Sequence, residues 1–419
     1  MKFKISTEKI WFVLLAVYLA AGYLANGTFL PTSVTSFSLY LFLIYSVFAI
    51  VGSGRIRLSP IFYWEVICLV LALVAILYSP DFSVFGVAFY PMIVNFVLVF
   101  IFTQMPWSRK YFDTVFFVYV ISAVVLIILL ALTGNLIDES ESGRLGTELM
   151  GNANNLAMIL MVSAISAIWL LVSSKSKMMK LLMALSLAAI YLGMFLSGGR
   201  KFVVIPIIFA FILLLFKVDK NGRRHIIKTL LIAVCVLFGM YFLIMKVPFF
   251  YNTIGYRFDG FFALFSEGGD VDGSTRVRFE MIEAGFKGWF DSPLWGHGFD
   301  SFKFYNEAEF TGYFYYSHNN FVELLFNQGI IGFCAYYGFY IYLLVATLKI
   351  RNHSVYKGLA VGFVLSCFIF EYFCVTYNVT PIQLMLFFCM FALKCAESDS
   401  ELSFETIRIC AHGKNKNIF

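Results

Sequence analysis

Residues 112–133 read FDTVFFVYVISAVVLIILLALT, a run in which Asp113 is the only charged residue. An α-helix needs roughly 20 apolar residues to cross the hydrocarbon core of a bilayer, so this run predicts a transmembrane helix. Comparable runs recur, and the predicted spans lie near 10–30, 36–51, 61–78, 84–103, 112–133, 153–172, 181–196, 202–216, 226–245, 329–347, 358–374 and 379–394. The sequence therefore predicts an all-α polytopic membrane protein with about 12 transmembrane helices. The 202–216 span is the shortest, which tilt or local bilayer thinning can accommodate.

The composition supports this class of protein and argues against several others. Hydrophobic residues make up 61% of the chain and charged residues 13%, and the mean hydropathy is +0.84. The net charge of +6 arises from Lys and Arg in short loops, and no basic patch interleaved with aromatic residues indicates nucleic-acid binding. The eight Cys residues lie in predicted spans or in the tail, which argues against a disulfide framework or a zinc site in the long polar loop.

The Lys and Arg residues of the short loops predict the orientation. They cluster before the first span and after the second, fourth, sixth, eighth and tenth spans, which the positive-inside rule places in the cytoplasm. We therefore expect a multi-pass protein of the plasma (inner) membrane with both termini cytoplasmic. The expected organisation is spans 1–9 in residues 1–245, an extracytoplasmic loop with amphipathic helices in 246–328, spans 10–12 in 329–394 and a cytoplasmic tail in 395–419.

The long loop contains a predicted amphipathic helix at 274–290. Met281, Ile282, Gly285, Phe286, Trp289 and Phe290 recur on one side at helical spacing. Arg276 precedes Glu280 by four residues, the spacing of a solvated ion pair. Arg278 lies on the apolar side near the free N–H groups of the first turn, where an anion is favoured. It is a candidate anion ligand, with snorkelling to the interface or pairing with a loop carboxylate as the alternatives.

A second helix is predicted at 317–328, leading into the tenth span. Ser317 is its expected N-cap, and His318, Asn319 and Asn320 lie at its N-terminal end. An imidazole accepts a proton near neutral pH, so His318 is a candidate general base. The alternative is an interfacial polar side chain. His297, between two turn glycines, is interpreted as a surface loop residue.

Further outward cations follow small or polar residues at the mouths of spans. Arg200 and Lys201 follow Ser197, Gly198 and Gly199, where exposed N–H groups and two cations favour phosphate. Arg144 opens the segment RLGTELMGNANNLA before the sixth span. Snorkelling of Arg200 and simple helix capping by the Asn residues are the alternatives. A diphosphate is the ligand that best uses several guanidinium groups.

These segments resemble the O-antigen ligase and Wzy-type (O-antigen or capsular) polysaccharide polymerase superfamily of bacterial envelopes. The resemblance rests on the span pattern, the long late loop, RLGTELMGNANN at 144–155, SGGR at 197–200, RFEMIEAGFKGWFDSPLWGHG at 278–298 and SHNNFVELLFNQGIIG at 317–332. The family spacing from an Arg to Pro and then Gly-x-Gly favours Arg278 over Arg276. Where many members have Asn-Pro-Asn, this chain has Asn152, Ala153 and Asn154.

The resemblance implies a membrane-embedded, GT-C-like, metal-independent glycosyltransferase of surface polysaccharide assembly with an extracytoplasmic active site. Its donor would be a polyprenyl-diphosphate-linked oligosaccharide of the undecaprenyl type, and no cofactor is expected. By this resemblance the diphosphate-binding residues would be Arg200 and Arg278, with Arg276 and Arg144 as further candidates. His318 would take the acceptor proton, and Asn319 and Asn320 would position the acceptor or the loop.

Three functions remain open at this stage. A repeat-unit polymerase for O-antigen or capsule is favoured. The first alternative is an O-antigen ligase that transfers the glycan to the lipid A core of lipopolysaccharide or to a protein. The second alternative is a polysaccharide transporter or flippase, which the largely apolar mid-span positions disfavour because such proteins bind substrate at the bilayer midplane.

Overall fold

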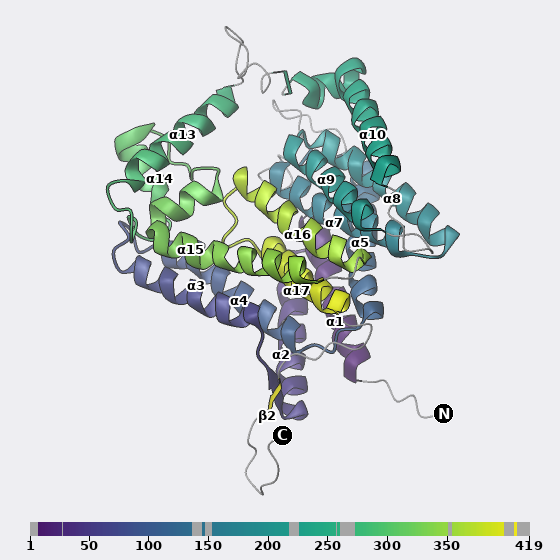
Figure 1. Ribbon diagram of the computed structural model, residues 1–419, viewed down its shortest axis with the longest axis horizontal. Helices are drawn as coiled ribbons and strands as arrows, with labels where there is room; N and C mark the ends of the chain where they lie inside the picture. The colour runs from purple at the N-terminus through teal and green to yellow at the C-terminus, as the bar shows by residue number, and fades with distance from the viewer. Residues whose placement is uncertain are drawn as a thin grey trace, which may run out of the picture.

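The computed structural model describes residues 7–26, 28–135, 145–146, 153–217, 226–256, 258–259, 273–350, 354–397 and 406–408. It is built almost wholly of helices (Figure 1). The helices, with η denoting π-helical turns, are α1 Thr7–Asn26, α2 Thr32–Ser53, α3 Pro60–Ile76, η1 Phe85–Phe89, α4 Tyr90–Gln104, α5 Arg109–Leu132, α7 Ala153–Ser173, α8 Lys177–Leu196, α9 Arg200–Phe216, α10 Ile226–Lys246, α11 Pro248–Phe250, η2 Tyr251–Gly255, α13 Gly273–Trp289, α14 Phe302–Tyr305, η4 Asn306–Phe310, α15 Asn320–Lys349, α16 Val355–Tyr372 and α17 Thr380–Glu397. Two short strands, β1 Arg55–Arg57 and β2 Thr406–Arg408, pair antiparallel.

The prediction of an all-α polytopic membrane protein is confirmed. Each of the twelve predicted spans coincides with a helix, and ten helices in the described part of the chain are long and apolar enough to cross a membrane, with η1 and α4 joined as one. The other two helices, α3 and α9, have 17 residues each. The protein is thus a multi-pass membrane protein.

The spans differ strongly in how far they are covered by the rest of the protein. α17 and α7 are the most buried, and α7 packs against α5, α8 and α9 while α16 packs against α9 and α17. By contrast, α10 is almost wholly exposed and lies at the edge of the bundle (Figure 1). Its Leu, Val, Ile and Phe side chains are suited to contact with lipid.

The helix α15 is broken at Gly329, whose φ of 62° and ψ of −166° are not helical. The break divides it into a short segment before residue 329 and a longer one after it, close to the predicted boundary between the 317–328 helix and the tenth span. The N-cap is Asn319, whose side chain accepts hydrogen bonds from the N–H groups of Phe321 and Val322. The prediction of Ser317 as the cap is therefore wrong by two residues.

A turn at residues 293–298 splints this break. The N–H groups of His297 and Gly298 donate to the carbonyls of Phe326 and Asn327, at 2.8 and 3.0 Å. In return the Pro293 carbonyl accepts from the N–H of Ile330, at 2.9 Å. Backbone groups that a broken helix would leave without partners are thereby satisfied.

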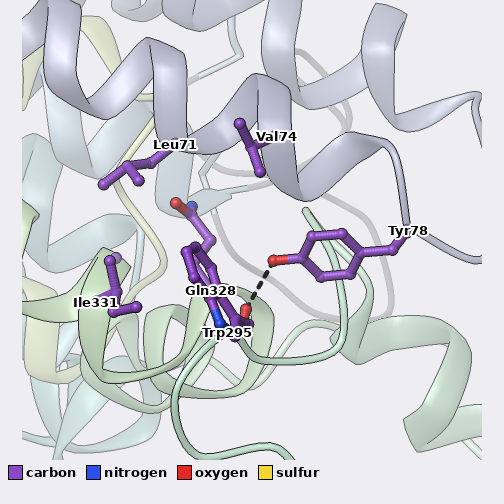
Figure 2. Close-up of a pocket in the computed structure, with 7 residues that line it drawn as sticks. Leu71, Val74, Tyr78, Trp295, Gln328 and Ile331 are labelled. Atoms are coloured by element: carbon purple, nitrogen blue, oxygen red, sulfur yellow. Dashed lines mark hydrogen bonds between the residues drawn. The ribbon is translucent and has the colours of Figure 1, made fainter.

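The same turn is anchored to α3 at its other side. The Tyr78 hydroxyl donates to the Trp295 carbonyl at 2.8 Å, beside Gln328 of α15 (Figure 2). The N–H of Phe299 donates to the Ala75 carbonyl at 3.1 Å. The turn therefore fixes the start of α15 relative to the membrane helices.

The amphipathic helix predicted at 274–290 is α13, and it packs against the first segment of α15. Its contact face is lined by Met281, Gly285 and Gly288, and a Cβ on either glycine would come within 2.5 Å of an α15 side chain. Phe286 and Phe290, which the periodicity placed on the buried side, are exposed. Contact through glycines brings the helix axes close together and leaves the bulky rings outside the interface.

Candidate functional site

A cavity of about 290 Å³ lies where α13, α14, the start of α15, α7, α9 and the loop between α16 and α17 meet. Its charged and basic lining consists of Lys201, Arg278, Asp300, Lys303 and His318. Uncharged polar residues, among them Asn154, Tyr316 and Tyr377, complete the wall. The lining residues are spread along the chain from Val87 to Val379, so only the folded protein assembles this site.

His318 is held in the cavity wall by the residues around it. Its φ of 57° lies in the left-handed region, which is uncommon for a residue with a side chain. On one side the Ser317 N–H donates to Glu323 Oε2 at 2.8 Å, and on the other Asn319 caps α15. The imidazole packs against the Tyr316 ring with centroids 4.4 Å apart. Such constrained backbones concentrate at functional sites.

The electrostatic surroundings keep the His318 imidazole neutral. Burial, followed by the positive charges of Arg278 and Lys201, lowers its pKa from 6.5 to about 3. All three effects disfavour a further positive charge beside Arg278 and Lys201. At physiological pH His318 is therefore a proton acceptor rather than a cation.

Arg278 and Lys201 approach the cavity from different helices. Arg278 is half-buried in α13, on the side of that helix facing the cavity. The Lys201 ammonium donates to the Phe373 carbonyl at 3.0 Å and lies over the rings of Phe202 and Phe370. Two cations beside a neutral imidazole create a site that favours an anion.

Asn319 and Asn320 fix the loops of the site rather than line its cavity. The Asn319 amide donates to the Tyr372 carbonyl at 3.1 Å. Asn320 Oδ1 accepts hydrogen bonds from the N–H groups of Thr376 and Tyr377, at 2.9 and 3.1 Å. Both side chains are buried, and together they tie the start of α15 to the loop that follows α16.

Arg200 and Arg276 lie in the described part of the chain but do not line the cavity. Arg200 lies one residue before Lys201, and its Nη2 donates to Thr275 Oγ1 at 3.3 Å, one turn of α13 before Arg278. Arg276 pairs with Glu280 at 3.1 Å, and 75% of its side chain is exposed. Arg144 lies outside the described residues. The structure thus brings together Arg278 and His318 and adds Lys201 in place of its neighbour Arg200.

Several polar groups of the site and the spans escaped the sequence analysis. Asp300 and Lys303 line the cavity, and their i,i+3 spacing after the glycine turn was the only signal. Glu65 and Glu371 are buried within α3 and α16. Glu371 accepts hydrogen bonds from the hydroxyls of Tyr336 and Tyr340, at 2.8 and 2.6 Å. Single acids inside long apolar runs are easily overlooked when periodicity guides the prediction.

His297 is a packing residue of the turn. Its ring stacks on Phe326 with centroids 4.5 Å apart, and Nε2 lies 2.7 Å from the Gly288 carbonyl. It is half-buried, so it is less exposed than the surface position expected for it. Within the described residues, no three His, Cys, Asp or Glu side chains converge as a metal site would require.

The fold and the cavity define a polytopic membrane protein with a cationic pocket at the mouths of its helices. Residues 183–337 match the family described as O-antigen ligase, and this match confirms the resemblance to the superfamily. The matched region runs from α8 into α15 and includes Lys201, Arg278, Asp300 and His318. The family is one of glycosyl transfer in surface polysaccharide assembly, with glycan-linked substrates in the bilayer. No curated protein matches the chain.

Proposed function

We propose that this protein transfers a glycan from a polyprenyl diphosphate to an acceptor hydroxyl, with repeat-unit polymerisation favoured and ligation to lipid A core or protein as the alternative. The observation that supports it is the neutral His318 in one cavity with Arg278 and Lys201. A base and two cations are what this reaction needs, because a hydroxyl loses a proton while a diphosphate leaves with negative charge.

Arg278 and Lys201 bind the diphosphate in this proposal. Negative charge develops on the leaving oxygen as the bond from the anomeric carbon to the phosphate breaks. Preorganised cations outside bulk water lower the barrier most, because they need no reorganisation as the charge develops. Arg278 can bind two phosphate oxygens at once, whereas Lys201 acts as a point charge.

His318 accepts the acceptor's proton as the new bond to the anomeric carbon forms. In the free protein Arg278 and Lys201 help to hold the pKa of His318 near 3, which makes it a weak base. A bound diphosphate would offset these two positive charges, so the pKa of His318 would rise when the donor is in place. Proton transfer is thereby coupled to donor binding. A single displacement inverts the anomeric configuration.

The other predicted residues have supporting places in this proposal. Arg200 binds Thr275 at the end of α13 that carries Arg278, which supports a role beside the diphosphate. Arg144 keeps the donor-site role implied by the resemblance. Arg276 is left out, since it pairs with Glu280 at the surface. Asn319 and Asn320 position the loops.

The proposed orientation puts the cavity outside the cytoplasm and both termini inside. It is supported by the Lys and Arg residues of the short loops and by the placement of α13 and β2 at opposite ends of the molecule in Figure 1. The division into 1–245, 246–328, 329–394 and 395–419 is retained on the same basis. Cysteine labelling from each side of the membrane tests both assignments.

The decisive experiment uses purified protein and a defined polyprenyl-diphosphate-linked oligosaccharide, with and without a lipid acceptor. Elongated lipid-linked products without the acceptor indicate a polymerase, and products on the acceptor alone indicate a ligase. Retained turnover in chelator supports metal independence. If neither product forms in bilayers that contain folded protein, transfer is the wrong reaction and transport of the intact donor becomes the function to measure.

A further inference from the structure

Asp300 and Lys303 line a part of the cavity that the proposed reaction leaves unassigned. Lys303 Nζ donates to Asp300 Oδ2 at 2.5 Å, and the Tyr377 hydroxyl donates to Asp300 Oδ1 at 3.2 Å. The side chains of Asp300 and Lys303 are only 12% and 16% exposed. An ion pair this covered costs desolvation energy and is weak evidence of a purely stabilising role.

The backbone at Asp300 is constrained in the same way as that at His318. Its φ is 52°, so Asp300 and His318 are two non-glycine residues of the same cavity in the left-handed region. Asn327 Oδ1 holds the following turn by accepting from the N–H groups of Ser301 and Phe302, at 3.1 and 3.0 Å. The turn itself is therefore held by Asn327, and the Asp300 side chain is directed to the cavity wall instead.

The pair differs chemically from the cationic side of the cavity. Carboxylate and ammonium charges offset each other, so this side has no excess charge to attract a second phosphate. An ionised carboxylate has about four acceptor positions, and Lys303 and Tyr377 occupy two of them. An ammonium has three donors. Together they present acceptors and donors side by side, as adjacent sugar hydroxyls require.

We propose that Asp300 and Lys303 form a sugar subsite that binds hydroxyl groups of the ring next to the reacting bond. This inference rests on the proposed function. A cavity of about 290 Å³ is at the small end of ligand pockets, so it holds the reacting groups rather than a whole repeat unit. The bound ring belongs either to the donor or to the acceptor, because both must meet at His318.

The test measures steady-state transfer with donor and acceptor varied separately. The variants are Asp300→Asn, Lys303→Met and the double variant, which leaves no unpaired buried charge. Loss of hydrogen bonds to charged groups should raise KM for one substrate by roughly 10-fold to 100-fold, with a smaller change in kcat. A rise for the donor assigns its first sugar to the subsite, and a rise for the acceptor assigns the acceptor's terminal sugar. The matched control is Glu283→Gln with Lys287→Met, an exposed pair on α13 that lies outside the cavity.

A binding measurement separates this inference from the proposed function. Polyprenyl diphosphate without a glycan should bind the Asp300 and Lys303 variants as it binds the unchanged protein, and it should bind Arg278→Ala weakly. Unchanged KM values for both substrates in the double variant would overturn the subsite and leave the proposed function intact. The subsite would also be overturned if the double variant lost binding of the glycan-free lipid as strongly as Arg278→Ala does. In that case the pair would act on the diphosphate or on folding. Normal lipid binding by Arg278→Ala would instead overturn the diphosphate site.

Discussion

Gly329 of α15 lies against the Leu294 peptide so closely that a Cβ on Gly329 would be 2.3 Å from the Leu294 carbonyl carbon. This contact joins the break in α15 to the turn that splints it. Since α15 begins beside His318, the precision of the candidate site depends on a packing contact some distance along the same helix.

Gly329→Ala should therefore destabilise the protein and impair transfer. The left-handed φ and the steric contact together should cost at least about 1–3 kcal/mol. Thermal unfolding in detergent measures the effect. Gly338→Ala, in the same helix with open space around it, is the matched control and should be neutral. Equal unfolding temperatures for the two variants would contradict the splint interpretation.

His318→Asn should abolish most transfer while the protein remains inserted and folded. Removal of a general base lowers rates by roughly 10²-fold to 10⁴-fold. Single-turnover assays with saturating donor measure the chemical step directly. A His318→Asn variant that turns over at the normal rate would assign the proton acceptor to another group.

The stability of the protein should depend on pH through His318. Because its pKa falls from 6.5 to about 3 on folding, the unfolded chain binds a proton between these values that the folded protein does not. The contribution of neutral His318 to the free energy of unfolding is therefore complete above pH 6.5 and is lost as the pH falls toward 3. Between pH 7 and pH 5 the unfolding temperature should drop less in His318→Asn than in the unchanged protein. Parallel decreases would show that the site does not contribute.

Arg278 and Arg200 should respond differently to substitution. Arg278→Ala removes a cavity cation and should lower kcat by roughly 10²-fold to 10³-fold. Arg278→Lys keeps the positive charge but lacks the planar guanidinium group. Its kcat should therefore lie between that of the unchanged protein and that of Arg278→Ala. Arg200→Lys should lose less, because Arg200 contacts Thr275 rather than lining the cavity. Transfer assays on all three variants provide the ranking, and a larger loss in Arg200→Lys would reverse these assignments.

Hydropathy and periodicity predicted the helices well because each span is a long apolar run. The same reasoning could not decide between Arg200 and Lys201, since both lie in the first turn of α9 and only packing determines which one lines the cavity. It also placed Phe286 on the buried face of α13, because a hydropathy pattern does not recognise Gly285 and Gly288 as the contact surface. The sequence could not predict Asp300 and Lys303 as cavity residues, because their position depends on a turn that is held in place by tertiary contacts.

The left-handed backbone of His318 also determines how that position must be mutated. Alanine removes the imidazole but adds a steric penalty at a dihedral angle that suits Gly and Asn better. A series of Gly, Asn and Ala at position 318 lacks the proton acceptor throughout and differs in backbone preference. Differences in the free energy of unfolding across that series would measure the conformational strain at residue 318. The measurement is independent of any chemistry that the side chain performs.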